Sequence, residues 1–277
     1  MRRGGALLAR ASASSSPLAA LPLGVARATF FRHFTAGEQL SEVRAVANRL
    51  STCGVRCIVD HSTEELEDAE SRRRNLQSKL TLLHTLSSEL AAACAFVPVK
   101  MTSLVAPALL EQVTLGAASA PSASLSTAVA NAKLTDGDQA AFAADMAGLR
   151  ELCAGAKAVG VPLLLDAEQT HRQPAIRLIA RSLAAEFNRD DDNDTGGPPM
   201  VYDTHQAYLI GTEDRLSEEL EHARAGGYTY AVKLVRGAYR HGETLRDGGS
   251  MLQPSKEATD EEYNKCAAML LEAAVGG

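Results

Sequence analysis

The sequence contains no tryptophan, few aromatic residues and no long apolar run, and each absence excludes a class of protein. Aromatic residues make up only 4% of the chain and the net charge is −6. Because no basic patch with interleaved aromatic residues offsets this balance, we expect no nucleic-acid partner. No run of about 18 or more apolar residues occurs, so no segment is expected to span a membrane.

The five cysteines do not form a metal site or a disulfide framework by their spacing. Their number is odd, and no two pairs have the spacing of zinc ligands, which favours a reducing compartment and buried thiols. The acidic stretch 190–197 resembles a calcium loop, but its glycine is displaced by one position and Tyr202 stands near the place where a bidentate glutamate is needed. We therefore expect no bound metal. The cysteines are Cys53, Cys57, Cys94, Cys153 and Cys266.

The first 37 residues contain no aspartate or glutamate and many serines and alanines, with positive charge from five arginines. This composition is typical of an organelle transit peptide, and it favours a mitochondrial address over a chloroplast one. The apolar stretches of the leader are short and interrupted, which argues against a secretory signal. We predict a transit peptide or disordered leader over residues 1–29. The arginines are Arg2, Arg3, Arg10, Arg27 and Arg32.

Beyond the leader, short apolar segments alternate with segments that have a helical period. This alternation predicts βα units and a parallel sheet. No Gly-x-Gly-x-x-Gly follows the first strand, which disfavours a dinucleotide-binding fold and favours a (β/α) barrel. We predict strands near 55–59, 95–101, 161–165, 200–202 and 230–235, helices near 38–50, 62–93, 138–159, 174–188 and 263–274, and a loop at 117–131.

The segment 161–170, Val-Pro-Leu-Leu-Leu-Asp-Ala-Glu-Gln-Thr, carries the strongest functional signal. Asp166 and Glu168 follow an apolar strand with the same parity, at the end of a parallel strand where barrels bind ligands. An acidic helix N-terminus is the structural alternative. Other predicted strands also end on polar residues, and a lysine there could pair with a carboxylate so that both stay charged. These residues are Lys100, Asp203, His205, Gln206, Lys233, Arg236 and Tyr239.

Three blocks of the sequence resemble the flavin-dependent proline dehydrogenases of mitochondria. They are 164–176 (LLDAEQTHRQPAI), 201–208 (VYDTHQAY) and 231–239 (AVKLVRGAY), and the last is the most specific. Segments 29–38 and 96–102 resemble the entry helix and second strand of the family. The resemblance covers the chain from about residue 30 to its last residue, so we expect 30–277 to be one proline dehydrogenase barrel domain.

The resemblance implies a fold, a reaction and a location. The fold is a distorted (β/α)8 barrel of the TIM type that holds FAD at the carboxyl ends of its strands. The enzyme oxidises L-proline to 1-pyrroline-5-carboxylate, transfers hydride to FAD and passes electrons to a membrane quinone. The resemblance therefore places the protein in the mitochondrial matrix, with peripheral association to the inner membrane.

The resemblance also implies roles for eight residues. Lys100 and Asp166 correspond to the ion pair that shapes the proline pocket, and Tyr239 to an aromatic wall on the substrate; these are the expected catalytic residues. The expected flavin contacts are Asp203, Gln206, Lys233, Arg236 and Gly237. Asp203 replaces the amide usual at its position.

One block of the family is absent from this sequence. Three further strands and a last helix with a Tyr-x-x-Arg-Arg pattern, whose arginines bind the carboxylate of proline, do not occur before Gly277. We therefore expect an incomplete barrel of about five βα units with weak flavin binding. The alternative is a weakly active or inactive fragment that acts as a non-enzymatic interaction piece. A Schiff-base aldolase with Lys100 or Lys233 as nucleophile is a third hypothesis.

Overall fold

The computed structural model describes residues 29, 33, 35–37, 40–60, 63–89, 93–118, 124–189 and 197–275. The chain divides into two compact units, residues 1–57 and 58–277. In the first unit, helix α4 (Leu40–Ser51) occupies the position of the helix predicted at 38–50. Most of the predicted leader, and residues 190–196 of the acidic stretch, lie outside the described residues, so both interpretations stay predictions.

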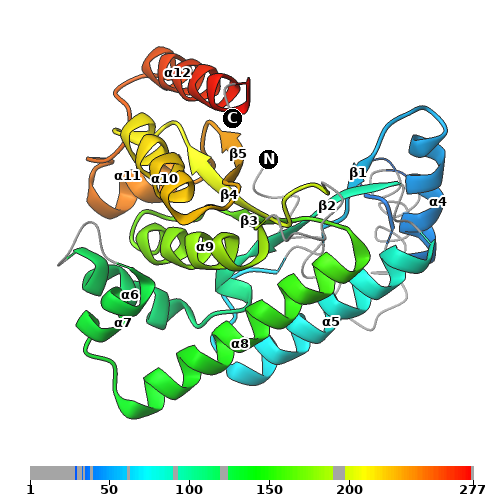
Figure 1. Ribbon diagram of the computed structural model, residues 1–277, viewed down its shortest axis with the longest axis horizontal. Helices are drawn as coiled ribbons and strands as arrows, with labels where there is room; N and C mark the ends of the chain where they lie inside the picture. The colour runs from blue at the N-terminus through cyan, green and yellow to red at the C-terminus, as the bar shows by residue number, and fades with distance from the viewer. Residues whose placement is uncertain are drawn as a thin grey trace, which may run out of the picture. The chain divides into compact units, whose positions relative to one another are not determined.

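Five strands form one sheet in the order β1-β2-β3-β4-β5, which is also their order along the chain (Figure 1). The pairs β2–β3, β3–β4 and β4–β5 are parallel, so the carboxyl ends of these strands meet at one edge. The sheet curls as one half of a barrel, and the predicted incomplete (β/α) TIM-type barrel is confirmed. The strands are β1 (Cys57–Ile58), β2 (Cys94–Lys100), β3 (Leu163–Asp166), β4 (Val201–Gln206) and β5 (Ala231–Val235).

Helices follow the strands and cover the outer face of the curled sheet (Figure 1). The helices predicted at 138–159 and 174–188 are present as α8 and α9, and the helix predicted at 263–274 is longer, beginning at Lys256. The helices are α5 (Ala69–Glu89), α6 (Pro107–Ala118), α7 (Leu125–Asn131), α8 (Asp136–Val159), α9 (Gln173–Phe187), α10 (Thr212–Gly226), α11 (Arg240–Asp247) and α12 (Lys256–Val275), with a short 3-10 turn at Met101–Ser103.

Two predicted boundaries are wrong. Helix α7 lies within the predicted loop 117–131, and it begins where the hydroxyl of Ser124 accepts a hydrogen bond from Thr127 N at 3.2 Å. The helix predicted to start at Ser62 begins instead at Ala69, after the Asp68 carboxylate accepts Ser71 N at 2.8 Å. Ser62 itself lies outside the described residues, and the segment before Asp68 is a loop.

Helices α5 and α8 lie side by side, and small residues on α8 allow this close approach (Figure 1). A Cβ atom on Gly148 would lie 2.8 Å from Leu76 Cδ2, and one on Gly155 would lie 3.3 Å from Leu80 Cδ2. A larger side chain at Gly148 would force the helices apart, because packed interiors leave no free space for an added methyl group.

Strand parity places Leu163 and Leu165 of β3 on the outer face of the sheet and Asp166 on the inner one. Leu163 and Leu165 on β3 are fully buried beneath the helices, together with Ile176, Ile179 and Leu183 of α9. Alternate residues of a strand point to opposite faces, so Asp166 points to the inner face of the half-barrel. The hydrophobic core therefore holds the strands from outside and leaves the inner face for polar side chains.

A buried asparagine fixes the start of two strands. Asn188 accepts hydrogen bonds from Met200 N and Val201 N, both at 2.9 Å. Its Nδ2 donates to Val201 O at 2.8 Å and to Thr229 O at 3.0 Å. Because these contacts hold the beginnings of β4 and β5 side by side, they set the register that brings the carboxyl ends of the strands together.

Pro98 lies inside β2 although proline cannot donate to a strand ladder. Val97 N donates to Pro162 O on the β3 side, and in a parallel ladder the next residue bonds to the opposite neighbour. Pro98 therefore faces the β1 side, where the short β1 has already ended at Ile58. Among the described strands, the missing N–H of Pro98 therefore removes no hydrogen bond of the sheet.

Candidate active site

The inner face of the sheet carries a row of polar side chains across four strands. Lys100 on β2 pairs in register with Asp166 on β3, and Thr204 on β4 pairs with Lys233 on β5. The register of the preceding residues on β3 and β4 places Asp166 beside Thr204. The four side chains therefore form one transverse row at the carboxyl ends of the strands, as the sequence predicts for Lys100, Asp166 and Lys233.

Asp166 joins the two lysines of this row. Its Oδ1 lies 2.5 Å from Lys233 Nζ and its Oδ2 lies 3.6 Å from Lys100 Nζ. The carboxylate is 14% exposed, and Lys100 and Lys233 are 21% and 32% exposed. The Asp166 carboxylate therefore lies between two cations, on a face that remains open to a ligand.

Lys100 makes two further contacts. Its Nζ donates to Tyr239 Oη at 2.9 Å and lies 3.1 Å from Glu64 Oε1. Burial lowers the pKa of Lys100, but the Tyr239 hydrogen bond and the negative charges of Asp166 and Glu64 reverse this, so the net pKa is raised. Burial raises the pKa of Tyr239 despite the opposing effect of Lys100. At neutral pH the site therefore presents a charged lysine next to a neutral phenol.

Glu64 is a site residue that the sequence pattern does not predict. The pattern at residues 62–65 predicts the first turn of a helix, which would use Glu64 at a helix start. In the structure α5 begins at Ala69, and the preceding loop lets Glu64 contact Lys100. An acidic residue just after a predicted strand was the signal that could have identified it.

Glu168 holds two strand ends together instead of facing a ligand. It is 1% exposed, and its two carboxylate oxygens accept Thr102 N at 2.9 Å and Thr102 Oγ1 at 2.7 Å. Burial raises the pKa of Glu168, and the two hydrogen bonds from Thr102 oppose this. The amide of Gln206 donates to Glu168 O at 2.9 Å. The predicted residues Glu168 and Gln206 thus link the ends of β2, β3 and β4.

A second glutamate–threonine pair has the same geometry. Glu243 on α11 is 2% exposed and accepts Thr170 N at 2.7 Å and Thr170 Oγ1 at 2.5 Å. This contact joins α11 to the loop that follows β3. Nothing in the local sequence distinguishes Glu243 from a surface residue of a short helix, so the sequence analysis did not identify it.

Arg236 and Gly237 lie just after β5 and differ in what they contact. Arg236 is half exposed, and its guanidinium lies 2.5 Å from Asp260 Oδ1 and 4.3 Å from the centroid of the Tyr263 ring, both on α12. Gly237 has φ +130°, and a Cβ atom there would lie 2.3 Å from Tyr208 Cδ1. Glycine is therefore required at 237, whereas Arg236 is held away from the lysine–aspartate row by α12.

The structure does not bring Asp203 to this row. Its side chain points to the outer face, where it is 2% exposed and accepts Tyr230 Oη at 2.7 Å and Thr204 N at 2.8 Å. Burial raises the pKa of Asp203 to about 7. His205 lies on the same face, contacts Tyr230 Oη at 2.8 Å, and has its pKa lowered to about 3 by burial. Asp203 and His205 therefore form a buried network behind the inner face.

The inner face also holds a buried polar atom that no protein group satisfies. Thr204 is 4% exposed and its Oγ1 has no hydrogen-bond partner in the structure. Buried hydroxyl groups in folded proteins are nearly always paired, so this atom fits a bound group beside Lys233. Among the described residues, no group of three or more acidic, histidine or cysteine side chains is arranged to hold a metal ion.

Comparison with known proteins gives a consistent result along the chain. The sequence model of a family described as proline dehydrogenase matches residues 43–275. The hydroxyproline dehydrogenase of Bos taurus is 31% identical over 275 residues, which cover 88% of this chain and 58% of that protein. The mitochondrial proline dehydrogenase 1 of Arabidopsis thaliana is 29% identical over 280 residues, which cover 92% of this chain and 55% of the relative. The chain thus spans less than two thirds of the length of these relatives.

A solved structure shares the fold. The chain superimposes on proline utilization A (PutA) of Bdellovibrio bacteriovorus, in a crystal structure of that protein inactivated by N-propargylglycine, with a TM-score of 0.69 and 19% identity. The match covers 88% of this chain and 24% of that protein. Among the described residues, no helix is both long and apolar enough to cross a membrane.

Proposed function

The chain belongs to the proline dehydrogenase family, and on that premise we propose that it oxidises L-proline to 1-pyrroline-5-carboxylate with FAD as hydride acceptor. The observation that carries the proposal is the row Lys100–Asp166–Lys233 with Tyr239, open on the inner face of the half-barrel. Barrel enzymes place their chemistry at this edge of the sheet. A partly buried lysine such as Lys100 suits a substrate that carries a carboxylate.

The residues present fit a flavin through their hydrogen-bond donors. The unsatisfied Thr204 hydroxyl and the neighbouring Lys233 ammonium offer such donors on the inner face. Gly237 lets the backbone pass close to the Tyr208 ring, where any side chain would clash. In the proposal Lys233, Gln206 and Gly237 hold the flavin, with Arg236 as a further contact, while Asp203 supports β4 from behind. Bound FAD would supply the two-electron acceptor for the hydride that leaves the carbon next to the ring nitrogen.

The remaining residues orient the substrate and stabilise charge in the site. The charges of Asp166 and Glu64 keep Lys100 positive, and this charge attracts the substrate carboxylate. The phenol of Tyr239, held by Lys100, provides a flat wall for the proline ring. Lys233 keeps a positive charge where negative charge develops on the acceptor, which lowers the barrier in a partly dry site.

The geometry disfavours the aldolase hypothesis. A Schiff-base lysine must lose its proton to attack a carbonyl. Lys100 has a raised pKa and two acidic neighbours, and Lys233 lies 2.5 Å from a carboxylate. Lys100 is therefore held in the charged form, which cannot act as a nucleophile, and the Lys233 amine is bound to Asp166.

The natural electron acceptor in this proposal is a membrane quinone, and the location is the mitochondrial matrix with peripheral contact to the inner membrane. The acid-free, arginine-bearing leader supports the address. The Arabidopsis thaliana relative is named as mitochondrial. Hydroxyproline is the second candidate substrate, because the Bos taurus relative is named as a hydroxyproline dehydrogenase.

The test is reduction of an artificial quinone by the purified protein supplied with FAD, with L-proline and with 4-hydroxyproline as substrates. We expect substrate-dependent reduction, and inactivation by N-propargylglycine. Lys233→Met should lower the rate about 100-fold, because a preorganised donor is lost. The matched control is Lys265→Met, which removes an exposed lysine of α12 and should leave the rate unchanged. Flavin binding without any oxidation of either substrate would favour the non-enzymatic alternative.

A further inference from the structure

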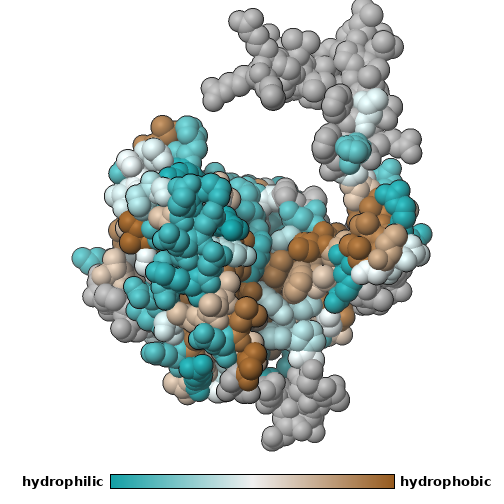
Figure 2. Space-filling model, turned by 90° about the horizontal axis from the view of Figure 1, so that it is seen from above, coloured by the Kyte–Doolittle hydropathy of each residue, from teal (hydrophilic) through white to brown (hydrophobic). Residues whose placement is uncertain are grey.

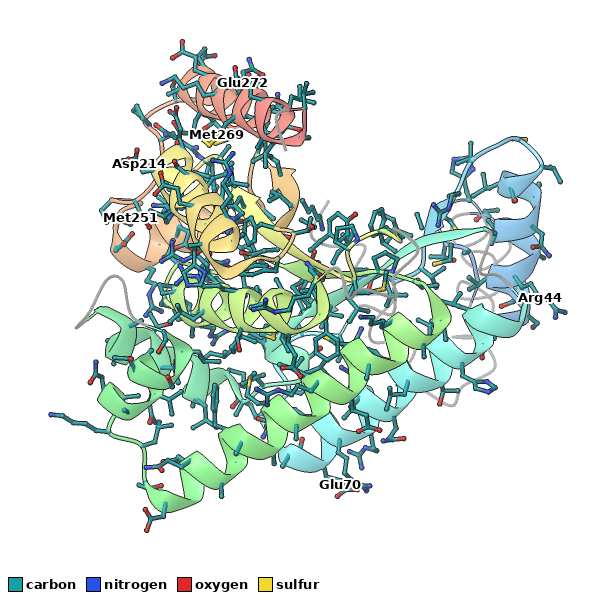
Figure 3. All side chains as sticks on the ribbon, in the orientation of Figure 1. Arg44, Glu70, Asp214, Met251, Met269 and Glu272 are labelled. Atoms are coloured by element: carbon teal, nitrogen blue, oxygen red, sulfur yellow. The ribbon has the colours of Figure 1, made fainter. Side chains whose placement is uncertain are left out.

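A cavity lies beside β4, and Thr204 and Gln206 of that strand are among the residues that line it. It has a volume of about 150 Å³ and lies between β4 and the first turns of α9 and α10. Met251, which is labelled in Figure 3 beside α10 and α11, forms part of its wall. A cavity of this size has room for a small polar group as well as for water.

Two arginines line this cavity from different helices. Arg177 on α9 is 17% exposed, and its Nη1 is buried without a hydrogen-bond partner. Arg215 on α10 donates to Ile210 O at 2.9 Å and to Thr212 Oγ1 at 2.8 Å, both neutral acceptors. Burial lowers the pKa of Arg215 and the charge of Arg177 lowers it further, whereas nearby acidic residues of α10 and α12 oppose this. The two cations therefore repel one another across a partly buried space.

The carboxylates around the cavity do not neutralise both arginines. Glu219 is fully buried and is already bound by Arg181 through contacts of 2.5 and 2.7 Å, so Arg177 reaches it only at 3.5 Å. Both oxygens of Asp203 are occupied by Tyr230 and by Thr204 N. Arg177 therefore shares one carboxylate with Arg181, and Arg215 donates only to the neutral oxygens named above.

We propose that this cavity is a binding site for a small oxyanion, with Arg177 and Arg215 as its ligands. Arginine presents a planar fork of donors that matches phosphate and carboxylate oxygens, and two forks from different helices can bind one tetrahedral anion. The cavity has room for inorganic phosphate or a small carboxylate. Anion binding at this site does not require the proposed dehydrogenase reaction.

The experiment titrates the purified protein with sodium phosphate at constant ionic strength and follows heat of binding and melting temperature. We expect saturable binding of phosphate, with sodium chloride at the same ionic strength giving none. Acetate is the arm that distinguishes a carboxylate from a phosphate site, and the tighter of the two identifies the ligand class. Absence of saturable binding by both anions would overturn the proposal.

Variants separate binding from folding. Arg177→Gln should weaken anion binding by roughly 10-fold or more, because charge-assisted hydrogen bonds are lost. Without anion the same variant should melt at or above the temperature of the parent protein, since the repulsion between the two cations is relieved. Arg215→Gln should also weaken binding, although its contact with Ile210 O could reduce stability, so Arg177→Gln is decisive.

The matched control is Arg224→Gln, an exposed arginine in the last turn of α10, which should bind phosphate as tightly as the parent protein. Unchanged phosphate affinity in Arg177→Gln would contradict the proposal. So would a lower melting temperature of this variant in anion-free buffer, because it would assign Arg177 a purely structural role beside Glu219.

Discussion

The two faces of the sheet at β3–β5 carry similar residue types in opposite environments. On the inner face, Asp166 joins Lys100 and Lys233 in a cluster that is charged and partly exposed. On the outer face, Asp203 and His205 share the hydroxyl of Tyr230 and are almost fully buried. Asp166 on the inner face is therefore a candidate ligand-binding group, whereas Asp203 on the outer face is a structural group.

Burial determines this difference, and it acts through the charge state. The inner carboxylate keeps two cationic partners and a share of solvent, so its charge can act on a ligand. On the outer face burial raises the pKa of Asp203 to about 7 and lowers that of His205 to about 3, so both groups tend to be neutral. Neutral hydrogen-bonded groups stabilise a strand without creating a field for a substrate. Figure 2 shows that hydrophilic residues cover much of the surface seen from above.

The largest effect should follow from breaking the inner cluster. Asp166→Asn removes the negative charge that two lysines share, and we expect substrate oxidation to fall by about 30- to 100-fold, which corresponds to about 2–3 kcal/mol in the barrier. Steady-state kinetics with L-proline measure this change. Asp136→Asn, at the exposed start of α8, is the control. Unchanged kinetics in Asp166→Asn would remove the inner cluster from the reaction.

The next effect should fall on stability instead of activity. Asp203→Ala leaves the Tyr230 hydroxyl and Thr204 N without their acceptor, and we expect a loss of about 2 kcal/mol in the free energy of unfolding. Chemical denaturation followed by circular dichroism measures it, with kcat per folded molecule within about 2-fold of the parent protein. A selective loss of flavin affinity without loss of stability would instead make Asp203 a flavin contact and erase the contrast between the faces.

A smaller effect concerns pH, because Asp203 and His205 change the stability of the fold with pH in opposite directions. The pKa of Asp203 is raised from 3.8 to about 7, so between pH 4 and 7 the folded state keeps a proton that the unfolded state has lost, and stability falls as pH rises. The pKa of His205 is lowered from 6.5 to about 3, so stability falls as pH drops from 6.5 towards 3. The two slopes oppose one another between pH 4 and 6.5.

Single variants should expose each slope. Asp203→Asn should make stability rise more steeply with pH in this window than in the parent protein, and His205→Gln should make it fall, each by at most about 1.4 kcal/mol per pH unit. Urea unfolding at half-unit steps of pH measures both. Parallel pH profiles for the two variants would show that the pair does not titrate as described.

The smallest effect should come from a residue that belongs to neither face. Arg236→Gln breaks an exposed pair with Asp260, and exposed ion pairs contribute little to stability. Thermal unfolding should therefore change by a few degrees at most. Flavin titration of the same variant tests the second role predicted for Arg236: weaker flavin binding with nearly unchanged stability would support the contact, and unchanged flavin affinity would leave Arg236 as a partner of α12 alone.

The sequence predicts the order of strands and helices well because apolar runs and turns are local signals. The strands at β2, β3 and β5 lie within two residues of their predicted positions. The site residues are predicted less completely, because a residue belongs to the site only if its side chain lies on the inner face of the sheet. Lys100, Asp166, Lys233 and Tyr239 do meet, whereas Asp203 faces the helices.

Two contacts could not be derived from local pattern. Glu64 reaches Lys100 only because the segment before α5 is a loop, and the helix-start pattern at 62–65 suggests otherwise. Glu243 contacts Thr170, a residue 73 positions earlier in the chain. Contacts at such separation depend on how the sheet curls, which no short window of sequence specifies. Recognition of the family motifs supplied part of this long-range information for Asp166 and Lys233.

The two glutamate–threonine pairs have a consequence for the order in which the chain is made. Glu168 holds Thr102, and Thr170, two residues beyond Glu168, is held in turn by Glu243. Each loop at the edge of the sheet thus depends on a residue synthesised later. During translation from the N-terminus, the edge that carries Lys100 and Asp166 stays incompletely joined until Glu243 has left the ribosome. Nascent chains stalled before that point should be cleaved by protease near Thr170, and chains stalled well beyond it should resist.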